Sequence, residues 1–230
     1  GLSLANWMVE GDPGADIWAM DVARYGDYAS LAYTNAKVRE NYSQRFSIRF
    51  PNEELPAARP QQPTALYDKM LAQGAVMGDS WGLETPLWFA PKGVEPKDIV
   101  SFRRSNDFPH VKAEVLATRN GVGVTEIANF AKYRFSGDGA EAFLSRLMTN
   151  KMPKTGRIVL TPMLNPAGKL IGDFTVAKVA AEQFLLWGSS AAQVYHLRWF
   201  EAHLPEDGTV RIDLTAVFDA AERSGAVLLL

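Results

Sequence analysis

The sequence predicts an α+β fold, with antiparallel or mixed sheets and helices packed on them. Two observations carry this prediction. Several short segments have apolar residues at helical spacing, and between them lie strand-like runs joined by tight turns. The clearest pair of strands lies in residues 155–177, where Pro166 and Gly168 supply the turn. Strands linked as hairpins favour an antiparallel sheet, because parallel strands need long crossover connections.

Composition excludes several classes of protein. The chain has 230 residues, of which 47% are hydrophobic and 22% charged, as in ordinary soluble globular domains. A formal net charge of −2 argues against nucleic-acid or acidic-membrane binding, which rests on clustered positive charge. The absence of cysteine excludes disulfides, thiolate metal sites and a cysteine nucleophile, and it fits a reducing compartment. We therefore expect a cytoplasmic protein that binds neither nucleic acid nor membranes.

The N-terminal half is predicted to hold three short helices, over residues 1–11, 28–41 and 66–73. Residues 51–63 carry four prolines in a polar context, which predicts a connecting loop or an extended arm. Residues 78–91 are aromatic and interrupted by Gly and Pro, which predicts an irregular surface segment. Residues 92–107 are charged and loop-like, so we place the main domain boundary there.

In the C-terminal half, some segments have apolar residues at helical spacing and others at strand spacing. Helical spacing predicts helices over residues 108–119, 138–149 and 191–203. Strands are expected at residues 122–127 and 131–135, in the hairpin 155–177, and at residues 183–187. Short helices that alternate with hairpin-linked strands are typical of an α+β sheet rather than of a doubly wound parallel one.

The segment Gly137–Ala142 has the pattern G-x-G-x-x-A between a predicted strand and a predicted helix. A dinucleotide fingerprint also needs an acidic residue about 20 positions further on to hold the ribose. Residues 154–160 contain none. We therefore interpret the glycines as a turn that leads into a helix, and we predict no nucleotide site there.

The three histidines are His110, His196 and His203. His196 and His203 are seven residues apart, so they can share one face of a helix. Zinc needs at least three protein ligands, and no third ligand lies at metal-binding spacing. We predict helix-surface or capping histidines, and no metal site.

Asp173 lies in the middle of the second strand of the predicted hairpin, where Asp is unusual. Strand alternation places it on one face with Ile171. One interpretation is a solvated face of an antiparallel sheet. The other is a carboxylate that, backed by Met163, Leu164 and Ile171, lines a pocket and accepts N–H bonds from an amine-containing ring. The strand pattern leaves both open.

An ordered set of segments resembles one known family. The segments are LANWMVEGDPGADIWAMDVARYGDYAS, the run ending in ETPLWF, GVTEIANFAKYRFSGDGAEAFLSRLMTN, TGRIVLTPMLNPAGKLIGDFTV and HLRWFEAHLP. Together they resemble the aminomethyltransferase (glycine-cleavage T-protein) fold, and more closely the C-terminal half of the dimethylglycine and sarcosine dehydrogenases. The resemblance implies a partial aminomethyltransferase-like folate-binding fold. It also implies that residues 1–100 link flavin and folate domains and that residues 101–230 begin the folate-binding domain.

The resemblance further implies a function and its site. Asp173 corresponds to the family's aspartate beside the reactive nitrogens of tetrahydrofolate, as catalytic and cofactor-binding residue. Phe130, Met163 and Leu164 correspond to apolar folate contacts. The implied reaction captures the carbon of an oxidised N-methyl amine as 5,10-methylenetetrahydrofolate, with FAD in a domain that this chain lacks. We expect an oxidoreductase fragment, and the resemblance leaves open whether it is active alone, pairs with a flavin subunit or forms a homo-oligomer.

Departures from the family pattern keep other interpretations open. Residues 186–190 lack the side-chain amide common in T-proteins, and DLTAVFDAAERSGAVLLL matches the family poorly. The alternatives are a folate-dependent aminomethyltransferase, a sulfonium demethylase relative, or a non-catalytic interaction module. The last rests on the aromatic residues Trp81, Trp88 and Phe89, which we expect to be either exposed or buried against a partner domain.

Overall fold

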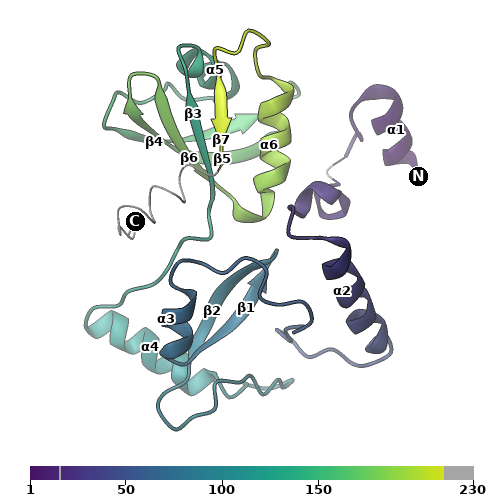
Figure 1. Ribbon diagram of the computed structural model, residues 1–230, viewed down its shortest axis with the longest axis vertical. Helices are drawn as coiled ribbons and strands as arrows, with labels where there is room; N and C mark the ends of the chain where they lie inside the picture. Colours follow the sequence, from purple (N-terminus) through teal and green to yellow (C-terminus); the bar gives the residue numbers. More distant parts are fainter. Residues whose placement is uncertain (16, 215–230) are drawn as a thin grey trace. The chain divides into compact units, whose positions relative to one another are not determined.

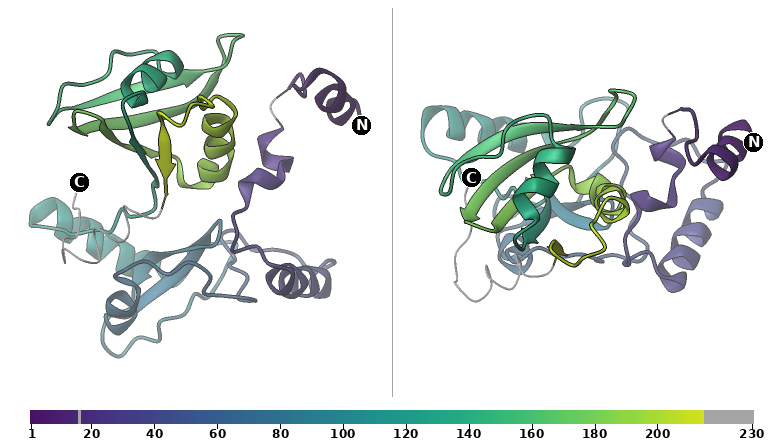
Figure 2. Two further views of the ribbon diagram at one scale, coloured as in Figure 1. Left: turned by 45° about the horizontal axis from the view of Figure 1, so that its top comes forward. Right: turned by 90° about the horizontal axis from the view of Figure 1, so that it is seen from above.

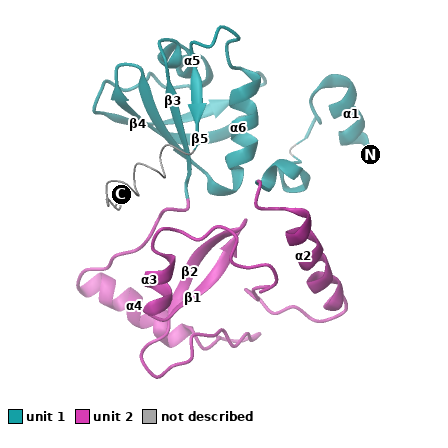
Figure 3. Ribbon diagram, viewed as in Figure 1, with its two compact units in different colours: residues 1–26, 130–228 teal, residues 27–129, 229–230 magenta. Residues whose placement is uncertain are grey.

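The computed structural model describes residues 1–15 and 17–214, and the chain forms two compact units (Figures 1 and 3). Among the described residues, unit 1 combines the chain up to residue 26 with residues 130–214, and unit 2 is Asp27–Asn129. Among the described helices, none is both long and apolar enough to cross a membrane. The assignment of residues 1–100 and 101–230 to a linker and a folate-binding domain stays a prediction.

Unit 1 is built on an antiparallel five-stranded sheet in the order β4-β5-β6-β3-β7. Its strands are β3 (Ala131–Ser136), β4 (Ile158–Leu164), β5 (Leu170–Ala180), β6 (Gln183–Gly188) and β7 (Arg211–Asp213). Its helices are α1 (Leu2–Glu10), α5 (Ala140–Leu147) and α6 (Gln193–Ala202), with 3-10 turns η1 (Trp18–Met20), η2 (Val22–Arg24) and η3 (Ser190–Ala192). This confirms the predicted α+β class and the predicted hairpin.

Helices α5 and α6 cover the same face of this sheet (Figure 2). Phe135 of β3 is fully buried and contacts both helices, with its ring centroid 5.8 Å from that of Phe143 and 5.0 Å from that of Phe200. Tyr133 and Phe174 extend the same aromatic cluster, because each packs its ring on Phe200. The core of unit 1 therefore lies between the inner face of the sheet and these two helices.

The opposite face of the sheet is the outer face. Residues paired directly across antiparallel strands point to the same side, and alternate residues point to opposite sides. Asp173 pairs with Pro162, and Thr175 pairs with Leu160 and Trp187, so all of these lie on the outer face. Leu160 is 60% exposed there.

The segment after α5 closes the free edge of β4. Met148 forms a bridge with Met163. The backbone N–H of Thr149 donates to the carbonyl of Pro162 (3.0 Å). The side-chain amide of Asn150 donates to the carbonyl of Leu160 (2.8 Å). These bonds satisfy carbonyl groups that an edge strand would otherwise leave open.

Unit 2 contains a two-stranded sheet and three helices. The strands are β1 (Ala75–Ser80) and β2 (Leu83–Phe89), and the helices are α2 (Leu31–Ser43), α3 (Tyr67–Ala72) and α4 (Phe108–Asn120). Ser80 pairs with Leu83, so Trp81 and Gly82 form a two-residue turn. Both have positive φ, 54° and 85°, as the preferred hairpin turns require. Val111 of α4 packs on a small core with buried Trp88.

Two sequence predictions are wrong. Residues 78–91 were expected to be irregular, yet they contain β2 and the end of β1. The turn escapes recognition because Trp81 takes a conformation usually held by Gly or Asn. Residues 122–127 were expected to be a strand, but none forms there, and Val122 and Val124 are 93% and 82% exposed. A strand needs a paired neighbour, and the sequence segment alone does not show that it lacks one.

The proline-rich arm is fixed to the β1–β2 hairpin by a buried ion pair. Arg59 donates from Nε to Oε1 of Glu84 (2.9 Å) and from Nη2 to Oε2 (2.6 Å). The same Nη2 also donates to the carbonyl of Met77 (2.9 Å). The hydrogen bonds that Arg59 donates to Glu84 raise the pKa of Arg59 despite its burial. The arm therefore packs on the hairpin through a desolvated, two-point contact.

Glu84→Gln should lower the free energy of unfolding by about 3 kcal/mol, because it removes the nearer carboxylate of the largely buried Arg59 and leaves only that of Glu54, 3.5 Å from Nη1. The matched control is Glu141→Gln, which breaks the pair with Lys178 in which Glu141 is half exposed. That change should cost less than about 1 kcal/mol. Urea unfolding of both variants measures the difference, and equal losses would contradict the expectation.

Candidate functional site

Asp173 lies on the outer face of β5 and is exposed. Within residues 1–15 and 17–214, no donor binds its carboxylate. Pro162 pairs with it on β4, which places an apolar ring beside the carboxylate on the same face. The oxygens of Asp173 are thus available to N–H donors that approach the outer face.

Phe130 lies at the same end of the sheet as Asp173. It precedes Ala131, which pairs with Gly188 at the end of β6. The pairing of Thr175 with Trp187 then places Asp173 at the same level, two strands away. Two inter-strand spacings amount to roughly 10 Å. Phe130 is 46% exposed, so an apolar ring and a carboxylate flank this end of the outer face.

Of the two predicted contacts on β4, only Leu164 lies exposed at the end of the sheet that carries Asp173 and Phe130. Met163 pairs with Gly172, is fully buried and belongs to the core on the inner face. Leu164 is 37% exposed at the end of β4. The structure therefore brings Asp173, Phe130 and Leu164 to one end of the sheet and places Met163 on the opposite face. The folate contacts of all four residues stay predictions.

A buried histidine lies behind Asp173, on the inner face. His196 projects from α6, is 2% exposed, and its Nε2 lies 3.1 Å from the carbonyl oxygen of Ile171. Because a carbonyl only accepts, Nε2 carries the proton. The ring also packs edge-on against Phe174, with centroids 4.8 Å apart. Sequence reasoning placed His196 on a helix surface or at a cap, which is wrong.

Two glycines make room for this ring. A Cβ atom on Gly172 would lie 2.5 Å from Nε2 of His196, and one on Gly188 would lie 2.7 Å from the ring of Phe174. A side chain at either position would therefore collide with one of these rings. Helix α6 can pack closely on β5 because Gly172 and Gly188 have no side chain.

Burial lowers the pKa of His196, although its bond to Ile171 and the negative charge of Asp173 act in the opposite direction. The imidazole is therefore neutral at pH 7, with its proton on Nε2. Among the described residues, Nδ1 has no hydrogen-bond partner. The ring is held by one hydrogen bond and by packing.

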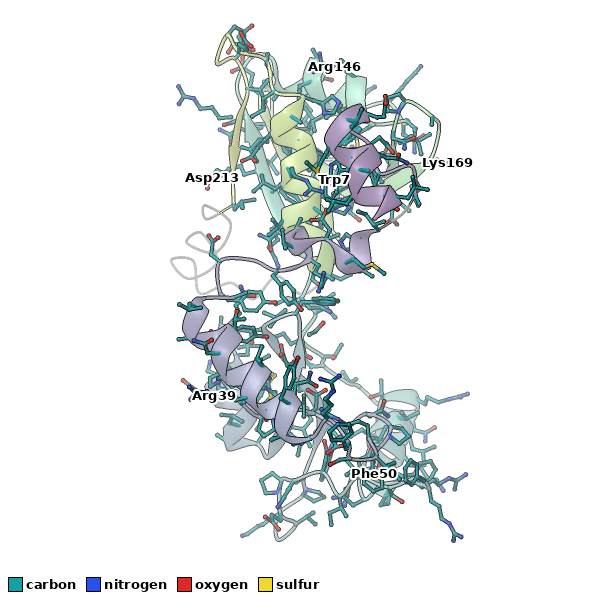
Figure 4. The ribbon with its side chains drawn as sticks, turned by 90° about the vertical axis from the view of Figure 1, so that its right-hand side faces the viewer. Trp7, Arg39, Phe50, Arg146, Lys169 and Asp213 are labelled. Carbon is teal, nitrogen blue, oxygen red and sulfur yellow. The ribbon has the colours of Figure 1, made fainter. Side chains whose placement is uncertain are left out.

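An ion pair holds α6 to the N-terminal segment of unit 1. Arg198 donates from Nη2 to Oδ2 of the buried Asp21 (2.6 Å), which also accepts from the backbone of Ala23 (2.9 Å). Burial raises the pKa of Asp21, but these bonds outweigh it and lower the pKa below its usual value. The same guanidinium lies 5.4 Å from the ring of Trp7 in α1, which Figure 4 labels.

The described residues also include the histidine, aromatic and glycine positions that the sequence analysis singled out. No group of three or more possible metal ligands forms there. His203 caps the end of α6, as expected, whereas Trp88 is 2% exposed, which corrects its predicted exposure. A Cβ atom on Gly139 would lie 2.6 Å from Oγ1 of Thr209. Thr209 therefore fills the space beside Gly139, which agrees with the predicted turn that leads into a helix.

Two family models match the sequence. The model of the GCVT N-terminal domain matches residues 66–222, and that of the FAD dependent oxidoreductase central domain matches residues 10–63. The chain belongs to the GCVT N-terminal domain family. This confirms the resemblance to the aminomethyltransferases and to the dimethylglycine and sarcosine dehydrogenases.

Individual proteins agree with this assignment. Mitochondrial dimethylglycine dehydrogenase of Rattus norvegicus is 34% identical over 201 residues, which is 87% of this chain and 24% of that protein. The mitochondrial pyruvate dehydrogenase phosphatase regulatory subunit of Mus musculus is 28% identical over 93% of this chain and 25% of its own length. The chain thus spans about a quarter of these relatives.

A solved structure has a similar fold. The crystal structure of glycine cleavage system aminomethyltransferase T from Bartonella henselae superimposes with a TM-score of 0.50 and 17% sequence identity. The match covers 66% of this chain and 37% of that one. This confirms the predicted partial aminomethyltransferase-like fold.

Gly172→Ala should lower the free energy of unfolding by about 1–3 kcal/mol, because its methyl group forces the ring of His196 to move. Gly1→Ala serves as the control, since a Cβ atom at Gly1 would meet no other atom within 4 Å. Urea unfolding compares the two variants. A control as unstable as Gly172→Ala would contradict the role of the ring.

Protonation of His196 should destabilise the fold. Its folded-state pKa is lowered from the ordinary value of 6.5, so the unfolded chain binds more protons as the pH falls through 6.5. The stability that the neutral ring of His196 contributes is fully present above pH 6.5. It is lost as the pH falls toward the pKa that His196 has in the folded state. We expect the unfolding free energy to fall less between pH 7.5 and 5.5 in His196→Gln than in the wild type. Identical pH dependence would exclude the effect.

Proposed function

We propose that this chain carries part of the tetrahydrofolate-binding domain of a flavin-dependent N-methyl amine dehydrogenase of the dimethylglycine or sarcosine type. Membership of the GCVT N-terminal domain family supports the folate part. The match of residues 10–63 to an FAD dependent oxidoreductase domain supports the flavin part. The observation that carries the proposal is Asp173, whose exposed carboxylate stands beside Pro162 with no donor from the described residues.

The carboxylate suits a ring that presents N–H groups. Tetrahydrofolate supplies nitrogen nucleophiles that accept a one-carbon unit, which gives 5,10-methylenetetrahydrofolate. Asp173 would accept an N–H bond from the reduced ring and stabilise positive charge that develops on its nitrogen. A charge-assisted bond of this kind is roughly twice as strong as a neutral one.

The apolar neighbours would orient the ring and keep water away from the reacting carbon. Phe130 offers an exposed aromatic surface at the same end of the sheet, and Leu164 offers an aliphatic one. Aromatic surfaces favour stacked or edge-on contact with flat rings. In the proposal, exclusion of water by these residues prevents release of the one-carbon unit as free formaldehyde. FAD, the amine substrate and any flavin subunit would lie outside this chain.

Tetrahydrofolate at about 100 times its dissociation constant should raise the melting temperature of the chain by roughly 5–10 °C. Asp173→Asn should abolish this shift, because an amide cannot supply the negative charge. Asp138→Asn is the matched control, since this exposed aspartate follows β3 at the other end of the sheet and should leave the shift intact. Differential scanning fluorimetry measures all three proteins.

No shift in the folded wild type, or an equal shift in Asp173→Asn, would overturn the proposal.

The cytoplasmic location also stays a proposal, against which the mitochondrial names of the relatives weigh. Fractionation of cells that make the protein, with compartment markers, decides between the two compartments.

A non-catalytic interaction module is the second candidate. It is favoured by the similarity to a phosphatase regulatory subunit, whose name describes a role without chemistry of its own. The two candidates differ in one measurement. A module that only binds a partner protein needs no charge at Asp173, so folate protection that depends on Asp173 would exclude this candidate. The aminomethyltransferase and sulfonium demethylase alternatives share the folate site and differ in the donor consumed.

A further inference from the structure

Strand β5 contains a bulge just before Asp173. Gly172 pairs with Met163, while Leu170 pairs with Leu164, so Ile171 has no residue opposite it on β4. On its other side, β5 has also passed the end of β6, because β6 ends at Gly188. The extra residue of a bulge is unpaired in the ladder, and the strand bends there. The direction of the next side chains depends on how this bulge is held.

His196 supplies the bond that the ladder lacks at Ile171. Its Nε2–H donates to the Ile171 carbonyl from α6, a different element on the inner face. The ring cannot easily move, since Gly172, Gly188 and Phe174 enclose it. The helix is itself fixed through the pair of Arg198 with Asp21. A rigid donor thus holds the backbone two residues before Asp173.

We propose that His196 is a positioning residue for Asp173: its bond to Ile171 locks the bulge and sets the direction in which the carboxylate leaves the sheet. This inference rests on the proposed function, in which Asp173 contacts tetrahydrofolate. Bulges occur beside active sites, where they redirect a side chain. A site of this kind must be held within about half an ångström of its productive geometry.

The two side chains also interact through charge, although they lie on opposite faces of β5. The negative charge of Asp173 raises the pKa of His196, against the larger effect of burial. Asp173→Asn removes this charge, so the pKa of His196 should fall further. The test therefore has a readout that does not depend on folate.

Three variants of the full 230-residue chain test the proposal by calorimetric titration with tetrahydrofolate. His196→Leu fills the space without a donor and should weaken binding roughly 3- to 10-fold. His196→Gln places an N–H donor at a similar distance and should restore binding to within about twofold of the wild type. His203→Gln is the matched control, because its ring also bonds a carbonyl, that of Trp199 in its own helix, and does not reach β5.

Amide hydrogen exchange adds a local readout. In His196→Leu, the amides of β5 around residues 171–173 should lose protection, while those of β3 keep it. In His196→Gln, protection should return. Uniform loss over the whole sheet would indicate a general weakening of the core and would overturn the positioning role.

The outcomes separate this inference from the function on which it rests. If Asp173→Asn binds tetrahydrofolate as tightly as the wild type, the proposed function fails. If Asp173→Asn loses binding but His196→Leu binds normally, the positioning role alone fails. Should His196→Leu not fold, His196→Met takes its place, because it also fills the space without an N–H donor: unchanged tetrahydrofolate binding and unchanged protection of residues 171–173 would overturn the positioning role, and loss of both would support it.

Discussion

The approach of helix α6 to strand β5 is the constraint on which unit 1 depends. It is set by Gly172 and Gly188, where any side chain would collide with the ring of His196 or of Phe174. The helix can then bring His196 and Phe200 into the inner face of the sheet, and the aromatic core closes around them. Strand alternation then places Asp173, the neighbour of Gly172, on the outer face. A packing requirement on one side of the sheet therefore determines what chemistry the other side can present.

Each unit attaches a segment outside its sheet through an ion pair with a buried carboxylate. In unit 1, Arg198 of α6 bonds Asp21, and in unit 2, Arg59 of the proline-rich arm bonds Glu84. In each pair the carboxylate is almost fully buried, so the guanidinium meets a charge that water does not screen. Such pairs are specific because removal of the arginine leaves a desolvated carboxylate. The pairs attach the N-terminal segment to α6 and the proline-rich arm to the β1–β2 hairpin without enlarging the hydrophobic core.

The sequence predicted the parts of the fold that local patterns encode. The hairpin 155–177 was found because its turn residues and apolar alternation both lie within one short window. The β1–β2 hairpin was missed because Trp81 occupies a turn position that Gly or Asn usually holds. Of the site, Asp173, Phe130 and Leu164 lie at one end of the sheet, and their folate contacts stay predictions. The burial of His196 depends on a glycine 24 residues earlier, which no local period reveals. The glycines of β5 and β6, followed by a helix that carries a histidine, are the sequence signal for this contact.

The covered edge of β4 limits how this sheet can associate. A foreign peptide that lengthens a sheet needs a row of vacant N–H and C=O groups on the outermost strand. Here Thr149 and Asn150 already occupy the carbonyls of Pro162 and Leu160, and Pro162 has no N–H to offer. Polymerisation by strand exchange is therefore blocked along this stretch. A protein that docks on unit 1 beside Asp173 must therefore contact side chains on the outer face of the sheet. It cannot pair its backbone with this stretch of the edge strand β4.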